Sequence, residues 1–210
     1  MSKYVTLIGN GTAVYTDRKS EFIGYAAHVE TEEEAIAFIS AIRKKHADAR
    51  HNVYAYMLRE GNITRYSDDG EPQGTAGIPV LDIIRKIGFT DAVIVVTRYF
   101  GGILLGTGGL VRAYSGAVAA CLNEAKIVSN ELSSELKVRL SYELYPVFLK
   151  FISDKKLCTL NSEFDRDVEI TFVLPRVLEK SFTEGLTDYL LGRAYIEKTG
   201  EYFYSYGGDK

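Results

Sequence analysis

Two glycine-rich segments on either side of one apolar run constrain this chain more than any other feature of its sequence. The first segment covers residues 67–79 (SDDGEPQGTAGIP) and the second covers residues 97–114 (TRYFGGILLGTGGLVRAY). Between them, residues 92–96 (AVIVV) have the length and β-branched composition of a buried strand. Glycine at this density allows sharp turns and close backbone approaches. We therefore expect two surface loops that are held on a rigid core.

The two glycine segments carry opposite charges. Asp68, Asp69 and Glu71 form an acidic loop in the first, whereas Arg98 and Arg112 belong to the second. Either arginine could form a bidentate pair with a phosphate, or it could pair with one of these acids. Carboxylates this close could also hold Mg²⁺. Asp-Gly followed by Glu-Pro is common turn chemistry, however, and it favours a turn over a metal site.

The second segment follows a strand and leads into a helix, where freed backbone amides favour an anion. Glycines would let these amides approach a phosphate, and an aromatic side chain beside them could stack on a base. The candidate anion- or nucleic-acid-binding residues are Arg98, Tyr99, Gly101, Gly102, Gly106, Gly108, Gly109, Arg112, Lys19 and His51. The alternative is that the glycines only let the helix pack on the sheet, with Tyr99 and Phe100 as a packed aromatic pair.

Motifs for catalysis and cofactor binding are missing from the sequence. No Gly-Lys-Ser/Thr of a Walker loop and no complete GxGxxG follows the strand, so we predict no nucleotide cofactor. No cysteine or serine has a recognisable nucleophile context, and no catalytic residue is assigned. Cys121 and Cys158 have neither a CxxC partner nor metal-ligand spacing, so we expect reduced, packed thiols.

Length, composition and charge place the chain among ordinary globular proteins. Its 210 residues suffice for one large domain or two small ones, and 46% of them are hydrophobic. No apolar run approaches the roughly 18 residues of a membrane span, and the N-terminus lacks a secretory signal pattern, so we expect a cytoplasmic protein without membrane contacts. Residues 1–130 carry equal numbers of acidic and basic side chains, so the net charge of −3 arises beyond them. This distribution favours an anion-binding face in the first half.

Hydrophobic periodicity predicts two α+β domains, at residues 1–130 and 131–210. In the first, Thr31 and Glu34 fit a capping box at the start of a helix that ends near residue 45. The other predicted elements of this domain are strands at 11–16, 22–29, 51–58, 63–66 and 92–97, and helices at 79–87 and 110–125, with a strand or link at 126–132. The second domain has strands at 136–144, 157–164, 167–173 and 194–204, and helices at 146–156 and 176–191. This β-α-β-β-α-β order is ferredoxin-like, and the tail at 205–210 is expected to fray.

The glycine segments resemble the hallmark segments of the IMPACT family, in its bacterial YigZ-like branch. Residues 19–22 (KSEF) and 51–56 (HNVYAY) are similar to the same family's pattern, and the resemblance covers roughly residues 15 to 125. It implies a first domain with the fold shared by a small-subunit ribosomal protein and domain four of elongation factor G. It also implies a ferredoxin-like second domain similar to domain five of that factor. Eukaryotic relatives act in translational control with an additional N-terminal domain, and we do not expect that role here.

Three functions are compatible with these observations. The first is a non-enzymatic module that contacts RNA or the ribosome and is linked to translation. The second is a small Mg²⁺-dependent enzyme that acts on a phosphorylated metabolite or nucleotide. The third, by analogy with the eukaryotic relatives, is a regulator that binds another protein.

Overall fold

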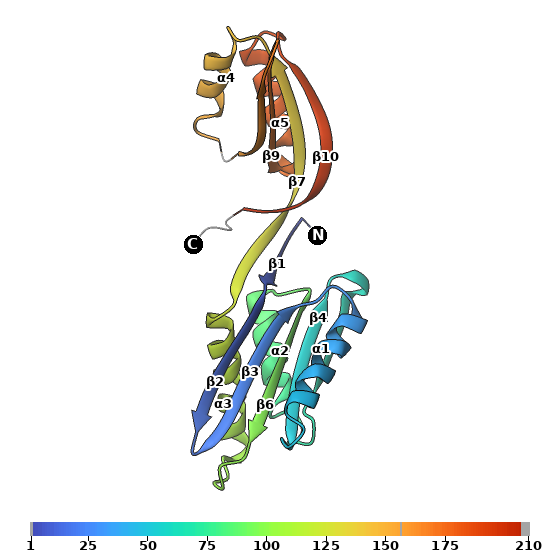
Figure 1. The fold of residues 1–210 in the computed structure, drawn as a ribbon, viewed down its shortest axis with the longest axis vertical. Coiled ribbons are helices and arrows are strands. Elements are labelled where there is room, and N and C mark those ends of the chain that lie inside the picture. Colours follow the sequence, from blue (N-terminus) through green and yellow to red (C-terminus); the bar gives the residue numbers. More distant parts are fainter. Residues whose placement is uncertain (1, 156, 207–210) are drawn as a thin grey trace. The chain divides into compact units, whose positions relative to one another are not determined.

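The computed structural model describes residues 2–155 and 157–206, which form two compact α+β units (Figure 1). The N-terminal unit comprises Tyr4–Ser129, and the C-terminal unit comprises the described residues of Asn130–Lys210 together with those of Met1–Lys3. The predicted α+β class is confirmed. The fraying predicted for the tail falls mainly on residues 207–210, which lie outside the described residues.

A five-stranded sheet lies at the centre of the N-terminal unit, in the order β2-β3-β6-β4-β5. Its strands are β2 (Asn10–Asp17), β3 (Ser20–His28), β4 (His51–Leu58), β5 (Ile63–Ser67) and β6 (Ala92–Tyr99). A short 3₁₀ turn, η1 (Glu60–Asn62), joins β4 to β5. These positions agree with the predicted strands to within a few residues.

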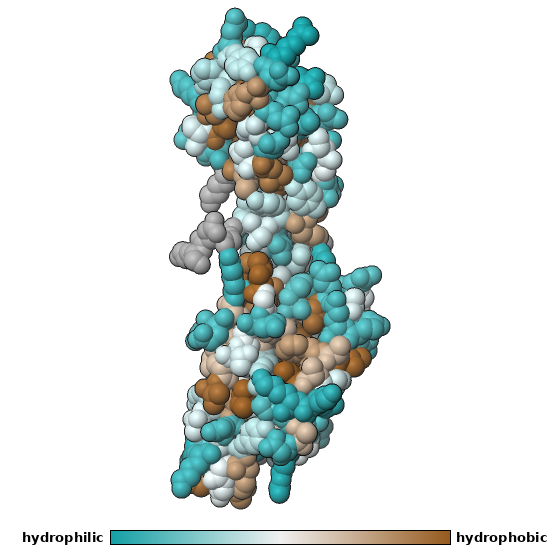
Figure 2. Space-filling view, in the orientation of Figure 1, coloured by the Kyte–Doolittle hydropathy of each residue, from teal (hydrophilic) through white to brown (hydrophobic). Residues whose placement is uncertain are grey.

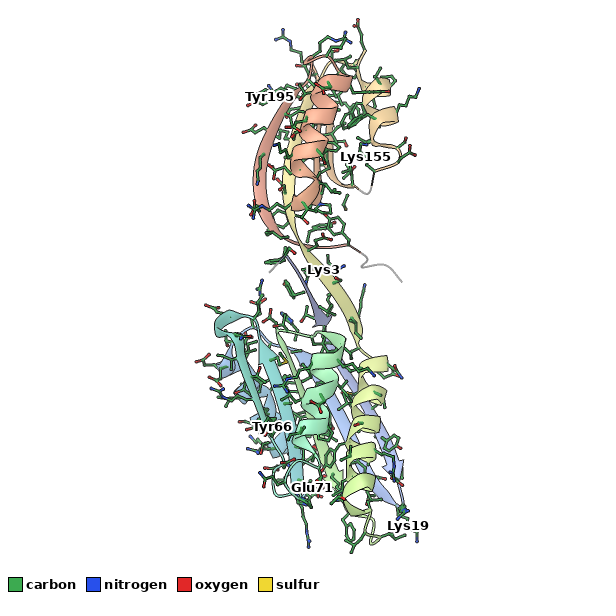
Figure 3. The ribbon with its side chains drawn as sticks, turned by 180° about the vertical axis from the view of Figure 1, so that it is seen from behind. Lys3, Lys19, Tyr66, Glu71, Lys155 and Tyr195 are labelled. Carbon is green, nitrogen blue, oxygen red and sulfur yellow. The ribbon has the colours of Figure 1, made fainter. Side chains whose placement is uncertain are left out.

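Helices cover both faces of this sheet (Figures 1 and 3). One face carries α1 (Glu32–Lys45), and the other carries α2 (Gly77–Ile87) and α3 (Gly106–Asn123). The predicted capping box of α1 is present, since the Glu34 amide donates to Thr31 Oγ1 at 3.2 Å. Gly24 lets α3 approach β3 closely: a Cβ there would lie 2.6 Å from the Ala117 carbonyl oxygen.

The burial of the central strand β6 explains why apolar and polar residues do not alternate in its sequence. Val96 and Ile94 point into the core beneath α2 and α3, whereas Val95 and Val93 point into the core beneath α1. A strand that is buried on both faces needs apolar residues at successive positions. Arg98 continues the α2/α3 side of this pattern and is therefore directed inward.

Helices α2 and α3 begin earlier than predicted. Helix α2 starts at Gly77 instead of Pro79, and α3 starts at Gly106 instead of Leu110. Glycine disfavours helix interiors, so the sequence predicts that the two helices begin beyond Gly77 and Gly109. In the structure the Asp68 carboxylate accepts the Gly77 amide at 2.8 Å and so stabilises a start of α2 two residues before the predicted one.

The C-terminal unit has the ferredoxin-like order that the sequence predicts. Strand β10 (Tyr195–Ser205) pairs with β7 (Lys126–Leu140), followed across the sheet by β9 (Val168–Pro175) and β8 (Cys158–Phe164). Helices α4 (Tyr145–Ile152) and α5 (Arg176–Tyr189) contribute Phe148, Phe182 and Leu186 to one core. None of the helices in the described residues combines the length and apolarity needed to cross a bilayer.

Two strands differ from the prediction. Residues 126–132, expected as a strand or a link, form one continuous strand with the predicted strand at 136–144, and this strand ends at Leu140. Strand β1 (Lys3–Ile8) was not predicted, and it also pairs with β7. The predicted end of the helix at residue 156 lies outside the described residues, and α4 ends at Ile152.

Candidate functional site

The candidate residues gather at one end of the sheet in the N-terminal unit. Strand β6 ends there with Arg98 opposite His51, the first residue of β4, and with Tyr99 opposite Glu21 near the start of β3. We call this region the loop end and define it by residues 17–21, 43–51, 68–76 and 98–112. Figure 3 labels Lys19 and Glu71 at this end of the unit.

The two glycine segments meet in a buried charge pair. Arg98 Nη1 donates to Glu71 Oε1 at 2.6 Å, and Tyr114 OH donates to the same oxygen at 2.8 Å. The side chains of Arg98 and Glu71 are only 8% and 3% exposed. Burial and the neighbouring Glu71 carboxylate raise the pKa of Tyr114. The expectation that Arg98 faces an anion is thus replaced by the alternative, because its place on a central strand buries it against an acid.

The other two acids of the first glycine segment also have internal partners. Asp68 accepts the backbone amides of Gly74, Ala76 and Gly77 at 2.8–3.1 Å, and so caps the start of α2. Asp69 accepts Arg43 Nη2 at 2.7 Å and the Asn52 amide at 2.6 Å.

These contacts match the turn interpretation of the acidic loop. Within residues 2–155 and 157–206, no three His, Cys, Asp or Glu side chains are arranged to hold a metal ion.

The β2–β3 turn holds two cations in an unfavourable backbone conformation. Asp17 pairs with Ser20, so Arg18 and Lys19 form a two-residue turn, with φ values of 45° and 67°. Such turns favour Asn and Gly, because other residues are strained at positive φ. Both side chains are exposed, and neither has an ion-pair partner in the described part of the chain.

Gly101 brings the second glycine loop against this turn. A Cβ at Gly101 would lie 2.0 Å from the Lys19 carbonyl carbon, so no larger residue fits without a backbone shift. The Gly101 amide donates to Ser20 Oγ at 3.1 Å, and this amide is therefore not free for a ligand. The structure thus brings together Gly101 and Lys19, two of the candidate anion-binding residues that the sequence predicts.

The N-terminus of α3 retains the properties expected of an anion site. Its N-cap residue, Leu105, supplies no side-chain hydrogen bond to the first turn. Gly106 and Gly108 are exposed, whereas Gly109 is buried. Arg112 is exposed and its Nη1 lies 3.7 Å from where a Cβ at Gly108 would be. Gly102, also exposed, has a φ of 85° in the loop before this helix.

The hydroxyl of Tyr99 is tied into a side-chain network, and the residue is half-buried. Its hydroxyl donates to Asp48 Oδ1 at 2.8 Å and lies 2.9 Å from His46 Nδ1. The other ring nitrogen of His46 lies 2.6 Å from the Tyr25 hydroxyl. The hydrogen bond to Asp48 raises the pKa of Tyr99, and burial lowers that of His46. Tyr99 therefore links the end of β6 to the segment that follows α1.

His51 is likewise a structural residue of the loop end. Its Nδ1 lies 2.8 Å from the Asp69 carbonyl oxygen, and the side chain is half-buried. This contact joins the start of β4 to the acidic loop.

Phe100 is the exposed aromatic residue that the sequence-based list of site residues left out. It is 51% exposed, and Leu104 in the same loop is 82% exposed. Its position in the sequence could have indicated this exposure, because Phe100 directly follows Tyr99, the last residue of β6, where the alternation between buried and exposed side chains ends.

The exposed charge at the loop end is predominantly positive. Its acids Asp68, Asp69 and Glu71 are engaged internally, which leaves the half-buried Asp17 and the exposed Glu21 and Asp48, of which Asp48 accepts Tyr99. The exposed cations without an ion-pair partner in the described residues are Arg18, Lys19, Lys44, Lys45, Arg50 and Arg112. Figure 2 shows hydrophilic and hydrophobic residues intermixed over this end of the unit. The loop end is thus locally basic in a chain of net charge −3.

Comparison with known proteins places the segment that contains the loop end in one family. The family model described as the Impact N-terminal domain matches residues 18–122, from the β2–β3 turn to the last turn of α3. This chain belongs to the IMPACT family. The IMPACT family member YvyE of Bacillus subtilis is 35% identical over 205 residues, which cover 97% of this chain and 94% of YvyE. The IMPACT family member YigZ of Escherichia coli is 34% identical and covers 86% of this chain and 90% of its own length.

The chain is also similar to a solved structure and to IMPACT proteins of eukaryotes. A chain described as the crystal structure of a hypothetical protein superimposes with a TM-score of 0.59 at 32% identity, and covers 93% of this chain and 97% of its own. The protein IMPACT homolog of Saccharomyces cerevisiae is 34% identical over 95 residues, which cover 43% of this chain and 37% of the yeast protein. The predicted family resemblance is confirmed.

Proposed function

We propose that the loop end binds RNA phosphates, and that this IMPACT protein is a module that contacts RNA or the ribosome. The observation that carries the proposal is the gathering of six exposed cations at the loop end, where Asp68, Asp69 and Glu71 are engaged inside the protein and three other acids remain, Asp17, Glu21 and Asp48. Lysine and arginine contacts to phosphates supply most of the non-specific affinity of proteins for nucleic acid. A local basic surface is sufficient for this, whatever the net charge of the chain.

The strained β2–β3 turn supports a ligand-binding role. Residues held at positive φ cost about 1–3 kcal/mol each and concentrate at functional sites. Asn and Gly would relieve this strain at Arg18 and Lys19, but they would remove both cations. The sequence therefore keeps positive charge at this tip at the expense of stability.

The first turn of α3 supports the same proposal. Its uncapped amides and the exposed Arg112 lie in the same loop end as the β2–β3 turn. Amides at a helix N-terminus favour negative groups. A phosphate backbone that crosses the loop end would meet side-chain cations and these amides together.

The two other functions have less support from the structure. A Mg²⁺-dependent enzyme was inferred from Asp68, Asp69 and Glu71, and all three carboxylates have protein partners. A protein-binding regulator stays a prediction, and an affinity pull-down with the full chain tests it. The family's likeness to elongation-factor domains agrees with RNA contact by analogy of fold.

The test replaces the strained cations by the residues that the turn prefers. Arg18→Asn combined with Lys19→Gly should leave the free energy of unfolding equal or higher, yet weaken binding to a structured RNA hairpin. The slope of log K against log salt should become shallower by roughly 1 to 2, because two phosphate contacts are lost. Fluorescence anisotropy at several salt concentrations measures both quantities, and co-sedimentation extends the test to ribosomes.

The control pair removes the same charge elsewhere on the unit. Arg85 and Lys86 are exposed in the last turn of α2, so Arg85→Gln combined with Lys86→Gln should leave the salt slope unchanged. Equal effects of the two pairs, or no binding by the wild-type protein at about 50 mM salt, would contradict the proposal.

A further inference from the structure

Three apolar side chains stand exposed at the tip of the basic loop end. Phe100, Ile103 and Leu104 are 51%, 42% and 82% exposed, and all belong to the loop between β6 and α3. We call them the apolar tip. Gly101, inside this loop, contacts the Lys19 backbone, so the apolar tip adjoins the Arg18–Lys19 turn. A contiguous exposed apolar patch rimmed by polar residues is typical of an interaction surface, and the apolar tip gathers three apolar side chains beside exposed cations.

Phe100 is supported from the protein side and not only exposed. The Arg98 guanidinium carbon lies 5.6 Å from the centre of the Phe100 ring, over the ring. Arg98 is itself fixed, because it is bound to Glu71 at 2.6 Å and lies 5.4 Å from the Phe22 ring centre. A buried ion pair thus holds the inner side of the ring and leaves the remainder of the ring to solvent.

A supported aromatic ring beside cations has the chemistry that binds an unpaired nucleotide. The base stacks on the ring, while the phosphates on either side of it meet the cations. A perfect A-form duplex keeps its bases stacked inside the helix, so it offers the ring no free face.

We propose that the apolar tip receives an unpaired base, and that the ligand is RNA with a loop, a bulge or a single-stranded segment. This inference rests on the proposed function and specifies its ligand class. A membrane surface is the competing partner for an apolar tip with cations. Lipid insertion needs no aromatic ring held in one orientation, and the contact with Arg98 therefore favours a base.

The first experiment uses the absence of tryptophan from the chain. Phe100→Trp places the one tryptophan of the chain at the apolar tip, where it can be excited at wavelengths that the tyrosines do not absorb. A hairpin with an unpaired loop should quench this emission by stacking. A perfect duplex of the same length and heparin, a polyanion without bases, should leave it unchanged. Emission that shifts to shorter wavelength with phosphatidylglycerol vesicles, and does not respond to the hairpin, would overturn the proposal in favour of a membrane.

The second experiment measures affinity without tryptophan. Phe100→Leu should weaken binding to the hairpin by about fivefold or more, the lower limit for loss of one base–aromatic stack. Phe100→Tyr, which keeps the ring, should bind as the wild type does. Phe164 is a matched control, because it is 53% exposed on β8 of the C-terminal unit, and Phe164→Leu should have no effect.

The results separate this inference from the proposed function. Salt-dependent RNA binding with equal affinity for hairpin and duplex, unaffected by Phe100→Leu, would overturn the unpaired-base proposal and leave phosphate binding intact. A wild-type protein that binds no RNA at low salt would overturn both.

Discussion

The buried contact between Arg98 and Glu71 is the element on which the geometry of the loop end depends, and Arg98→Met tests it. The substitution removes the guanidinium but keeps an unbranched apolar chain of similar length. The Glu71 side chain, which is 3% exposed, would then keep Tyr114 as its one side-chain hydrogen-bond donor among the described residues. Removing one partner of a buried ion pair costs about 3–5 kcal/mol, because a charge stays buried without compensation.

A double-mutant cycle separates this cost from packing. Glu71→Gln combined with Arg98→Met removes both charges, so the double variant should be more stable than Arg98→Met alone. Tyr114→Phe removes one hydrogen bond to a charged group, and should cost about 1.5–3 kcal/mol. Arg98→Met should thus cost more than Tyr114→Phe, and more than the double variant. The reason is the burial of the Glu71 carboxylate and not the size of the side chains that are replaced.

Urea denaturation of the full chain, followed by far-UV circular dichroism and tyrosine fluorescence, measures these changes. Because the two units can unfold separately, each transition is fitted on its own. Only the transition of the N-terminal unit should move. A loss of less than about 1 kcal/mol in Arg98→Met, well below the range for a buried pair, would refute the reasoning, and so would a double variant that is less stable than the single one.

Three further predictions follow from individual residues. Gly101→Ala should destabilise the protein by about 2 kcal/mol or more in urea denaturation, since its Cβ would overlap the Lys19 backbone, whereas Gly108→Ala on the open first turn of α3 should not destabilise it. Burial raises the pKa of Cys121 to about 12, so a thiol reagent such as dithionitrobenzoate should label the half-buried Cys158 in the native protein and Cys121 only after unfolding. Burial holds the native pKa of His46 below its ordinary 6.5, so the contribution of neutral His46 to stability is present above about pH 6.5 and is lost as the pH falls through the native pKa. His46→Gln should therefore reduce the difference in unfolding free energy between about pH 7.5 and pH 5.5. An unchanged difference would contradict this role of His46.

Elements that depend on local sequence were predictable. The capping box at Thr31 and Glu34 defines the start of α1 from four residues alone. The apolar run of β6 was recognised because a strand covered on both faces needs no alternation. In the C-terminal unit, regular spacing of strands and helices was sufficient for the ferredoxin-like order.

The features that the sequence left open depend on contacts between distant segments. Whether Arg98 would meet a phosphate or an acid depended on the place of Glu71, which is 27 residues away in the chain. The sequence predicts Phe100 as a packed partner of Tyr99, but Phe100 lies beyond the last residue of β6, is 51% exposed and contacts the Arg98 guanidinium instead. Strand β1 pairs with β7, more than a hundred residues later, and no local pattern indicates such a pairing.

Hydrogen exchange of the full chain with and without an RNA hairpin is the most direct test of the loop end as the contact surface. Our account predicts slower exchange of amides in residues 17–21 and 98–112 when RNA is bound, with no change along β8 and β9. Protection confined to the C-terminal unit, or RNA binding without protection at either segment of the loop end, would contradict it.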